Sequence, residues 1–450
     1  MTNSLPDGMY VEYRLVLIEP QSMRILTRDT VEGPMLPRES VSAYTRIAQT
    51  LTEAIEQRYG FSSLQLAILP AVEGNSDCAV HEIIGPTEDT PGSFSFLVQD
   101  EITLGELSDE EKAFVLKILK GETNALGKFA RLGWITDLLT KTGRRPSDDH
   151  WPTIRQFNQS VDFCLLSWMS DEGHKLWFKA VGKPNTREYA LTAELSRRFP
   201  KYLPTILLDV PEWNGWVMED VQGVPLNESD DIHHCEDALA ALAIMQKEMV
   251  CNVDSLASLG ARTWSCTRIA SLSEQFFTEA RHAMRAQTST KALPLSGSEL
   301  FQLQRNIDVA LNEFMDPRIP DTLLHGDIGH GNVIATSCGP VFLDWAETYI
   351  GHPFICAEHL LADLARSNRL FADRQATLRS FYADQWRTHL LTAELKRISL
   401  LAPAVAAFAY GVIAWETFSD RNDPEQVWPL LRSMLRRAKG ELHKSSGVMA

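Results

Sequence analysis

Short apolar segments separated by polar turns run through the first hundred residues, and the pattern predicts strands. These segments lie at residues 13–18, 23–26, 64–69, 79–84 and 94–98. Between the second and the third, residues 41–59 carry Ile47, Leu51 and Ile55 at helical spacing, and Gly60 follows as a stop signal. We therefore expect a β-rich unit that contains one helix.

A helical connector is predicted next. Ser108 and Glu111 form a capping-box pattern ahead of an amphipathic run that Gly121 closes, and residues 129–139 predict a second helix. The polar cluster at 142–149, which contains Gly143 and Pro146, is the best domain boundary in the chain.

Beyond this boundary, residues 154–157, 162–168 and 176–181 predict three strands, and residues 157–161 form the turn between the first two. Lys179 lies inside the third strand, where a charge is costly to bury without a partner. The alternative is a lysine at the strand edge that points to water.

The rest of the chain is predicted to be mainly helical. Residues 232–250 and 300–314 are amphipathic, and Ser296 with Glu299 is the expected cap of the second helix. The longest apolar run, residues 400–415, contains Pro403 and is shorter than the roughly 20 residues that span a bilayer. We interpret it as a buried helix and expect no membrane association.

Length and charge limit the function. A chain of 450 residues predicts two or three domains, since single cores stop growing at about 250–300 residues. The net charge of −16 argues against nucleic acid as a partner and is only weakly in favour of a cationic substrate. The seven cysteines include no Cys-x-x-Cys pair, and the first residues resemble no signal peptide, so we expect reduced thiols in a cytoplasmic protein.

One stretch carries chemistry. Asp327 and Asn332 lie between apolar runs, and Asp344 follows a second apolar run after a short turn. Phosphoryl transfer needs a carboxylate that orients and deprotonates the attacking hydroxyl, and oxygen ligands for Mg²⁺. One amide and one carboxylate suffice, because Mg²⁺ takes few protein ligands.

The residues His325-Gly326-Asp327, His330-Gly331-Asn332 and Leu343-Asp344-Trp345 resemble the aminoglycoside phosphotransferase and choline kinase family, small-molecule kinases with a protein-kinase-like fold. The resemblance covers roughly residues 128–440. It implies that Asp327 is the catalytic base, that Asn332 and Asp344 bind Mg²⁺, and that His325 braces the loop. His330 is expected to shape the loop without taking part in the chemistry.

The resemblance also implies ATP-binding residues. Lys179 would hold the phosphates, with Glu188 as its partner and Glu194 in reserve. Ser160 would contact a phosphate, because the turn at 158–161 has no glycine. In the segment between the lobes, Met218 would lie beside the adenine, and the main chain of Glu219 and Val221 would bind it.

The order of strands and helix in residues 1–105 is similar to a Nudix domain. The metal-binding glutamates of that family are missing, since Ala54, Gln57 and Arg58 take their places when the pattern is aligned on Gly60. The expected fold is therefore α+β, with a bilobal kinase-like part after an inactive Nudix-like α/β domain. The expected boundaries are 1–105 for this domain, 106–150 for the connector, 151–222 for the small lobe and 223–450 for the helical lobe.

The predicted function is ATP-dependent transfer of a γ-phosphate to a hydroxyl of a small molecule. Amino alcohols, sugars and aminoglycosides all suit such a scaffold, and the sequence does not choose among them or fix the oligomeric state. After Asp344, Glu347 and Glu358 are either substrate-facing acids or ordinary solvated or capping ones. The alternatives to a kinase are an inactive nucleotide-binding regulatory protein and, less favoured, a Nudix-type hydrolase.

Overall fold

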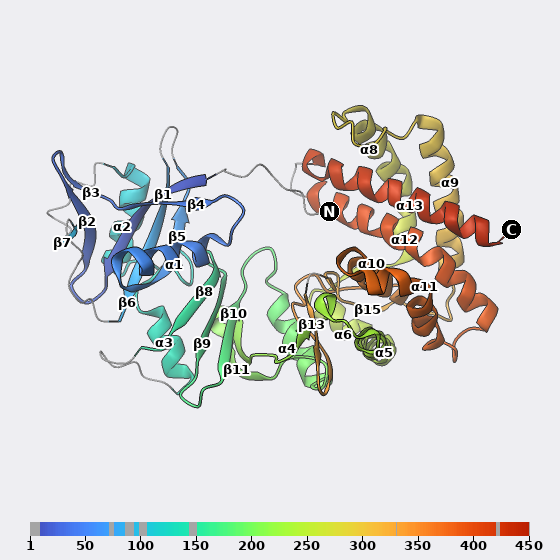
Figure 1. Ribbon diagram of the computed structural model, residues 1–450, viewed down its shortest axis with the longest axis horizontal. Helices are drawn as coiled ribbons and strands as arrows, with labels where there is room; N and C mark the ends of the chain where they lie inside the picture. The colour runs from blue at the N-terminus through green and yellow to red at the C-terminus, as the bar shows by residue number, and fades with distance from the viewer. Residues whose placement is uncertain are drawn as a thin grey trace. The chain divides into compact units, whose positions relative to one another are not determined.

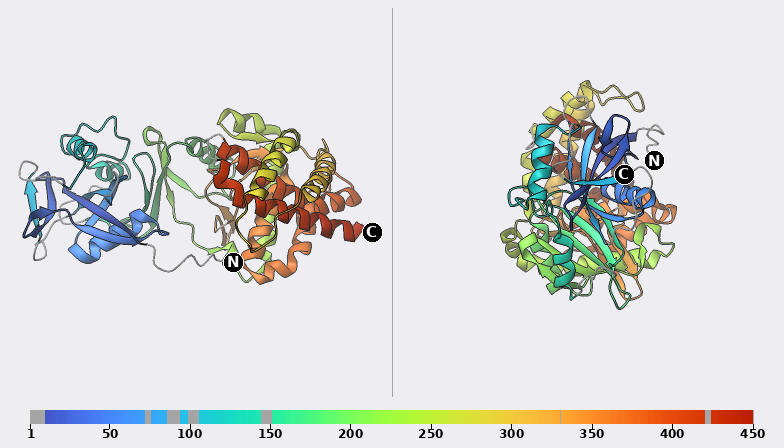
Figure 2. Two further views of the ribbon diagram at one scale, coloured as in Figure 1. Left: turned by 90° about the horizontal axis from the view of Figure 1, so that it is seen from above. Right: turned by 90° about the vertical axis from the view of Figure 1, so that its left-hand side faces the viewer.

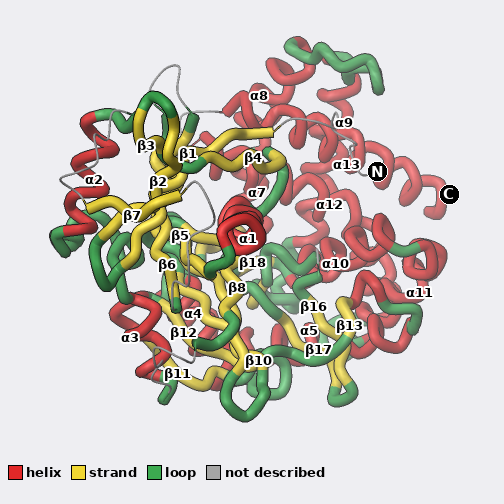
Figure 3. Tube along the Cα trace, turned by 60° about the vertical axis from the view of Figure 1, so that its left-hand side comes forward, coloured by secondary structure: helices red, strands yellow, loops and turns green. Residues whose placement is uncertain are grey.

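A computed structural model describes residues 10–71, 76–85, 94–98, 106–143, 151–329, 331–419 and 424–449. The chain divides into two units by packing. The N-terminal unit comprises residues 1–189 and 205–220, and the C-terminal unit comprises residues 190–204 and 221–450. Strands outnumber helices in the first unit and helices predominate in the second (Figure 3), so the chain is mixed α+β, as predicted.

The first sheet of the N-terminal unit has the strand order β3-β2-β1-β6-β5, with β4 paired to β1 and β7 paired to β2. β1 and β6 are parallel, and the other pairs are antiparallel. The strands are β1 (Tyr10–Glu19), β2 (Arg24–Thr30), β3 (Gly33–Met35), β4 (Arg38–Ser42), β5 (Ser62–Leu69), β6 (Asp77–Ile84) and β7 (Phe94–Val98).

The predicted helix of this region is α1 (Ile47–Tyr59). It buries Leu51 and Ile55 against the sheet, and Gly60 ends it in the left-handed conformation at φ 79°, which glycine adopts without steric cost. The pattern of apolar residues and the stop signal are both confirmed here.

The connector holds α2 (Asp109–Leu119) and α3 (Trp134–Lys141). Both hydrogen bonds of the predicted capping box between Ser108 and Glu111 are present. The second helix begins at Trp134 rather than at Phe129, because the Phe129 N–H donates to the Val161 carbonyl and Gly133, at φ 75°, starts the helix. The polar cluster that follows falls outside the described residues from 144 onward.

A second, antiparallel sheet has the order β11-β12-β10-β9-β8. Its strands are β8 (Ile154–Gln159), β9 (Cys164–Met169), β10 (Lys175–Ala180), β11 (Ile206–Val210) and β12 (Gly215–Glu219). The first three confirm the predicted strands. The turn between β8 and β9 lies two or three residues later than predicted, since the Ser160 N–H donates to the Phe163 carbonyl and closes it there.

One hydrophobic core joins the two sheets and the connector. Phe129 and Trp134 of the connector stack edge-on, 4.9 Å apart, and both contact Phe178 of β10. The buried amide of Gln156 bonds to both backbone groups of Gln65, where β5 is irregular, at 2.8 and 3.0 Å. The predicted boundaries near residues 105 and 150 fall outside the described residues, and these boundaries and the Nudix-like interpretation stay predictions.

The C-terminal unit is built from helices around two small sheets, β13-β16-β17 and β14-β18-β15. The short strands are β13 (Val224–Pro225), β14 (Arg262–Trp264), β15 (Thr322–Leu324), β16 (Val333–Thr336), β17 (Gly339–Phe342) and β18 (Tyr349–Gly351). The helices are α5 (Ile232–Met249), α6 (Val253–Ser258), α7 (Cys266–Ser271), α8 (Ser273–Arg285), α9 (Gly297–Phe314), α10 (Pro353–Ser367), α11 (Arg369–Asp384), α12 (Thr392–Ser419) and α13 (Trp428–Met449), while α4 (Glu188–Arg198) starts in the N-terminal unit. The predicted cap of α9, formed by Ser296 and Glu299, is confirmed.

The apolar run near the C-terminus forms the middle of α12. By length and composition this helix is able to cross a membrane, but 72% of its apolar window is buried inside the protein. It packs along α13 and against α10 (Figures 1 and 2), with small side chains such as Ala404 and Ala409 fully buried. It therefore has the environment of a core helix, as predicted.

Buried histidines make stability depend on pH. Burial lowers the pKa of His81 and of His352 to about 3 and that of His359 to about 4. Below pH 6.5 these three histidines therefore bind more protons in the unfolded chain than in the folded chain, and their contribution to stability falls as the pH decreases from 7 toward 4. At pH 5 each histidine should have lost about 2 kcal/mol of its contribution.

Denaturant unfolding at pH 7 and pH 5 measures this loss. In His81→Leu the loss of stability between pH 7 and pH 5 should be about 2 kcal/mol smaller than in the wild type, because one of the protonating groups is gone. The neighbouring Glu82 acts in the opposite direction, since burial raises its pKa to about 7 and its protonation stabilises the folded chain as the pH falls. The same change of unfolding midpoint with pH in the variant and in the wild type would contradict the prediction.

Candidate active site

The predicted catalytic stretch is a loop followed by a hairpin. The loop leaves β15, the hairpin is made by β16 and β17, and Asp344 follows it. The Leu343 N–H donates to the Asn332 carbonyl at 2.8 Å, next to the pair formed by Val333 and Phe342. Because an antiparallel hairpin brings the start of one strand to the end of the other, it places Asn332 and Asp344 at the same end.

Asn332 also fastens the loop to Asp327. Its Nδ2 donates to the Asp327 carbonyl at 2.8 Å and to the Asp327 carboxylate at 3.3 Å. The Asp327 side chain is exposed, so its carboxylate is accessible to a substrate. Since the amide nitrogen is used inside the loop, the Asn332 oxygen remains the group that can bind a metal.

His325 braces the loop from below. It is fully buried, its Nε2–H donates to the Leu343 carbonyl at 2.7 Å, and its ring lies 4.4 Å from the ring of Trp345. This contact ties the start of the catalytic loop to the segment that carries Asp344. His330, which was expected to shape the loop, lies outside the described residues.

Two backbone positions in this region have special conformations. Gly326 has φ 84°, and a Cβ there would lie 2.1 Å from the Glu347 carbonyl oxygen, so only glycine fits. Asp344 has φ 59°, a left-handed value that aspartate and asparagine tolerate better than other side chains do. The backbone conformation at these two positions therefore favours glycine at 326 and aspartate at 344.

The donor set suits Mg²⁺. Asn332 would supply one amide oxygen and Asp344 one carboxylate, which are the hard oxygen ligands that Mg²⁺ prefers in proteins. The described residues contain no group of three or more His, Cys, Asp or Glu side chains that could enclose an ion.

Lys179 and Glu188 form a buried ion pair in the N-terminal unit. Their charged atoms are 2.5 Å apart, and the two side chains are 10% and 1% exposed. Lys179 is on β10 and Glu188 is the first residue of α4. Glu194, the reserve partner, instead pairs with Arg197 and Arg198, so the lysine does not point to water and its partner is Glu188.

Ser160 lies in the turn between β8 and β9, where its Oγ accepts the Phe163 N–H at 3.1 Å. Its hydroxyl proton is still available for donation, because an oxygen that accepts can also donate. Ser160 also lines a cavity with Arg46 and Ile47 at the start of α1. The sequence did not indicate that the N-terminal domain reaches this turn.

The predicted adenine-binding segment leaves β12. The Glu219 N–H donates to the Thr205 carbonyl at 3.1 Å, and the Asp220 N–H donates to the Lys175 carbonyl at 3.0 Å. Met218 is half-buried on β12, and Val221 is the first residue of this segment in the C-terminal unit. The nucleotide-binding roles of these residues stay predictions.

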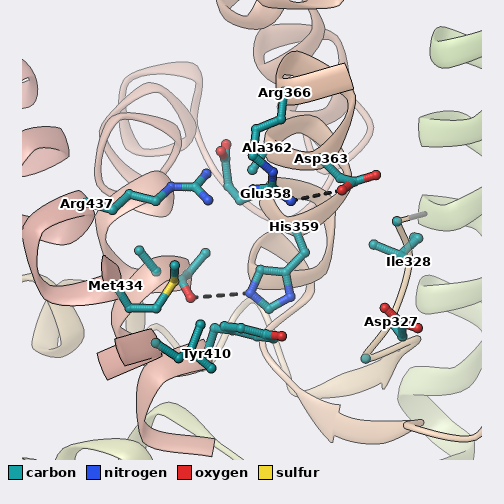
Figure 4. Close-up of a pocket in the computed structure, with 15 residues that line it drawn as sticks. Asp327, Ile328, Glu358, His359, Ala362, Asp363, Arg366, Tyr410, Met434 and Arg437 are labelled. Carbon is teal, nitrogen blue, oxygen red and sulfur yellow. Dashed lines mark hydrogen bonds and ion pairs between the residues drawn. The ribbon is translucent and has the colours of Figure 1, made fainter. Parts of the chain in front are cut away.

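A cavity of about 300 Å³ lies beside Asp327 in the C-terminal unit. Ile328, Ala362 and Met434 are among the apolar residues that line it, and Tyr410 and His359 stack edge-on at 5.5 Å in its wall. Burial lowers the pKa of His359 to about 4, so this ring is neutral at pH 7, and its Nε2–H donates to the Ala406 carbonyl at 3.3 Å. Figure 4 shows this arrangement.

Most of the cavity was not predicted from the sequence. The sequence suggested Glu347 and Glu358 as substrate-facing acids. Glu358 lines the cavity but accepts hydrogen bonds from Nε and Nη2 of Arg379, and Glu347 is exposed and does not line the cavity. The arginines of the lining, Arg366 and Arg437, were missed, since they lie in helices far along the chain from Asp327. A signal was present for Arg437, which adjoins the buried stripe of Leu435, Ala438 and Leu442 on α13.

A family comparison matches the part of the chain that carries the loop, the hairpin and Glu188. Residues 185–395, slightly less than half of the chain, match the model of the phosphotransferase enzyme family, APH. This range lies within the predicted residues 128–440 and contains Asp327, Asn332 and Asp344.

Solved structures of small-molecule kinases are also similar. Macrolide 2'-phosphotransferase MphH from Brachybacterium faecium is 14% identical with a TM-score of 0.43, and the match covers 67% of this chain and 96% of that one. Ethanolamine kinase from Plasmodium vivax is 12% identical with a TM-score of 0.43 and coverages of 77% and 96%. Choline kinase LicA from Streptococcus pneumoniae is 13% identical with a TM-score of 0.41 and coverages of 69% and 98%. No curated protein matches the chain.

Proposed function

We propose that this chain is an ATP-dependent phosphotransferase that moves the γ-phosphate to a hydroxyl of a small molecule. The observation that carries the proposal is the hydrogen-bonded loop in which Asn332 holds Asp327 while the hairpin brings Asp344 to the same end. The matched phosphotransferase family supports it. The inactive alternative is not favoured, because all three residues of the catalytic set are present.

In the proposed reaction the exposed carboxylate of Asp327 orients the acceptor hydroxyl and accepts its proton. The acceptor oxygen forms a bond to the γ-phosphorus, the bond from that phosphorus to the β–γ bridging oxygen breaks, and ADP leaves. Positioning and electrostatics supply most of the rate enhancement in such chemistry. The brace from His325 to the Leu343 carbonyl therefore matters, because it holds the loop in one geometry.

The remaining predicted residues would hold the nucleotide. Lys179, fixed by Glu188, would contact the phosphates, Ser160 would donate to one of them, and the main chain of Glu219 and Val221 would bind the adenine, beside Met218. Asn332 and Asp344 would hold Mg²⁺, which when bound neutralises charge on the phosphates. We propose a cytoplasmic location, in keeping with the seven unpaired cysteines.

Titration calorimetry with ATP and GTP, with and without Mg²⁺, tests the proposal. We expect nucleotide binding that becomes about tenfold or more tighter with Mg²⁺, because the metal screens the phosphates from the carboxylates of the site. Release of ADP in the presence of a library of small hydroxyl compounds then measures transfer. An absence of nucleotide binding under every condition would contradict the proposal.

A further inference from the structure

The cavity beside Asp327 indicates which class of acceptor fits. Asp327 and Ile328 lie on one side of it, and Arg437 and Met434 lie on the other (Figure 4). Its volume of about 300 Å³ is at the lower end of ligand pockets, which span roughly 300–1,000 Å³. A compound of the size of one sugar ring fits this volume.

The acids of the cavity wall other than Asp327 are already balanced. Glu358 is 3% exposed, and its carboxylate accepts hydrogen bonds from both Nε and Nη2 of Arg379. Asp363 is 5% exposed and pairs with Arg366 at 2.9 Å. A cationic acceptor would therefore find its negative charge only at Asp327, which the proposed reaction uses as the base.

Arg437, a cation of the cavity wall, lacks a close partner of opposite charge in the part of the chain that the structure describes. Among the described residues it forms no hydrogen bond and no ion pair within 4.0 Å, although it is half-buried on α13. Two other arginines of α13 are engaged, since Arg432 donates to the Ala283 carbonyl at 2.9 Å and Arg436 to the Leu293 carbonyl. Arg437 is thus the cation of this helix that the protein directs into the cavity and leaves without a close partner.

The surroundings of Arg437 favour an added anion. Burial lowers its pKa, and the nearby Arg366 and Arg379 lower it further, against a partial opposite effect of Glu441 and Glu358. A half-buried guanidinium among other cations is poorly solvated, and a carboxylate or phosphate restores two charge-assisted hydrogen bonds in the fork geometry of arginine.

We propose, on the basis of the proposed phosphotransferase function, that the acceptor is a small hydroxylated acid. Its anionic group, a carboxylate or a phosphate, binds Arg437 across the cavity while one of its hydroxyls faces Asp327. The apolar residues between them, including Ala362 and Ala406, contact the carbon skeleton.

The test compares acceptors that share a carbon skeleton and carry a neutral, cationic or anionic group. Glucose, glucosamine, glucuronate and glucose 1-phosphate form one set, and glycerol, serinol, glycerate and glycerol 3-phosphate form another. ADP release is measured for the wild type, for Arg437→Gln and Arg437→Lys, and for Arg369→Gln as a control of equal charge change at a residue whose side chain is 94% exposed. Thermal unfolding checks that each variant is folded.

We expect an acid of one set to be a better acceptor than the neutral and amine compounds of that set. Transfer to glucuronate or glycerate would show that the anionic group is a carboxylate, and transfer to glucose 1-phosphate or glycerol 3-phosphate would show that it is a phosphate. Arg437→Gln should raise KM for that acid about 10- to 100-fold and leave kcat less affected, because hydrogen bonds to a charged group are lost. Arg437→Lys should lie in between, and Arg369→Gln should equal the wild type.

If the neutral or amine compounds are the better acceptors and Arg437→Gln phosphorylates them as fast as the wild type does, this inference is overturned. The phosphotransferase proposal would still stand in that case. If no compound is phosphorylated, calorimetric titration of the same acids decides. Binding that Arg437→Gln abolishes would support the anion site while the phosphotransferase proposal fails, and no binding of any acid would overturn the inference.

Discussion

Asp327→Asn should lower kcat by about 10²- to 10⁴-fold, the range that general-base catalysis contributes. The substitution removes the basicity of the side chain but keeps an oxygen that can accept the bond from Asn332 Nδ2, so the loop should keep its shape. The binding of ATP with Mg²⁺ should change little, because Asp327 contacts the acceptor in the proposed reaction. Steady-state ADP release and nucleotide titration on the same preparation measure both effects.

Asp373→Asn is the matched control, because it makes the same chemical change on α11 at a residue whose side chain is 71% exposed. It should have wild-type kcat. Turnover of Asp327→Asn equal to that of the control, with any accepted substrate, would show that Asp327 is not the base.

Asp344→Asn should abolish the Mg²⁺-dependent part of nucleotide binding and lower kcat by roughly 10²- to 10³-fold, since charge stabilisation at the phosphates is lost. Asparagine is the informative replacement, because Asp344 has φ 59° and asparagine tolerates this conformation. An alanine at this position would add backbone strain of roughly 1–2 kcal/mol and would confuse a loss of metal with a loss of structure.

The titrations with and without Mg²⁺ measure this effect, and the unfolding midpoint checks the fold. If the variant kept the wild-type dependence on Mg²⁺, the metal site would have to be sought elsewhere. Because Asp344 is proposed to bind the metal and Asp327 to accept the proton, the two variants separate the effect on nucleotide binding from the effect on proton transfer.

Local patterns predicted much of the fold. The two capping boxes, the stop of α1 at Gly60 and the buried helix at residues 400–415 were all foreseen, because each depends on residues only a few positions apart. The expected start of α3 was wrong, because it depends on a contact between residues far apart in the sequence. Phe129 is bound by Val161, more than thirty residues away, and no helical periodicity records that contact.

The predicted catalytic stretch also depends on near neighbours, since Asp327, Asn332 and Asp344 lie in one loop and directly around one hairpin. The choice of Glu188 over Glu194 as the partner of Lys179 was not. Both glutamates lie in α4, and only the packing of that helix beside β10 brings one of them to 2.5 Å from the lysine.

The sequence by itself therefore determined the loop, the hairpin and the chemical types of their side chains, because hydrogen bonds between near neighbours specify these features. Only the tertiary structure decided that Gln156 holds the irregular part of β5, that the connector shares a core with the second sheet, and that Arg437 lines the same cavity as Asp327. Such contacts join residues from about thirty to more than a hundred positions apart, and they arise from how apolar faces pack together, which a local pattern of residues does not encode.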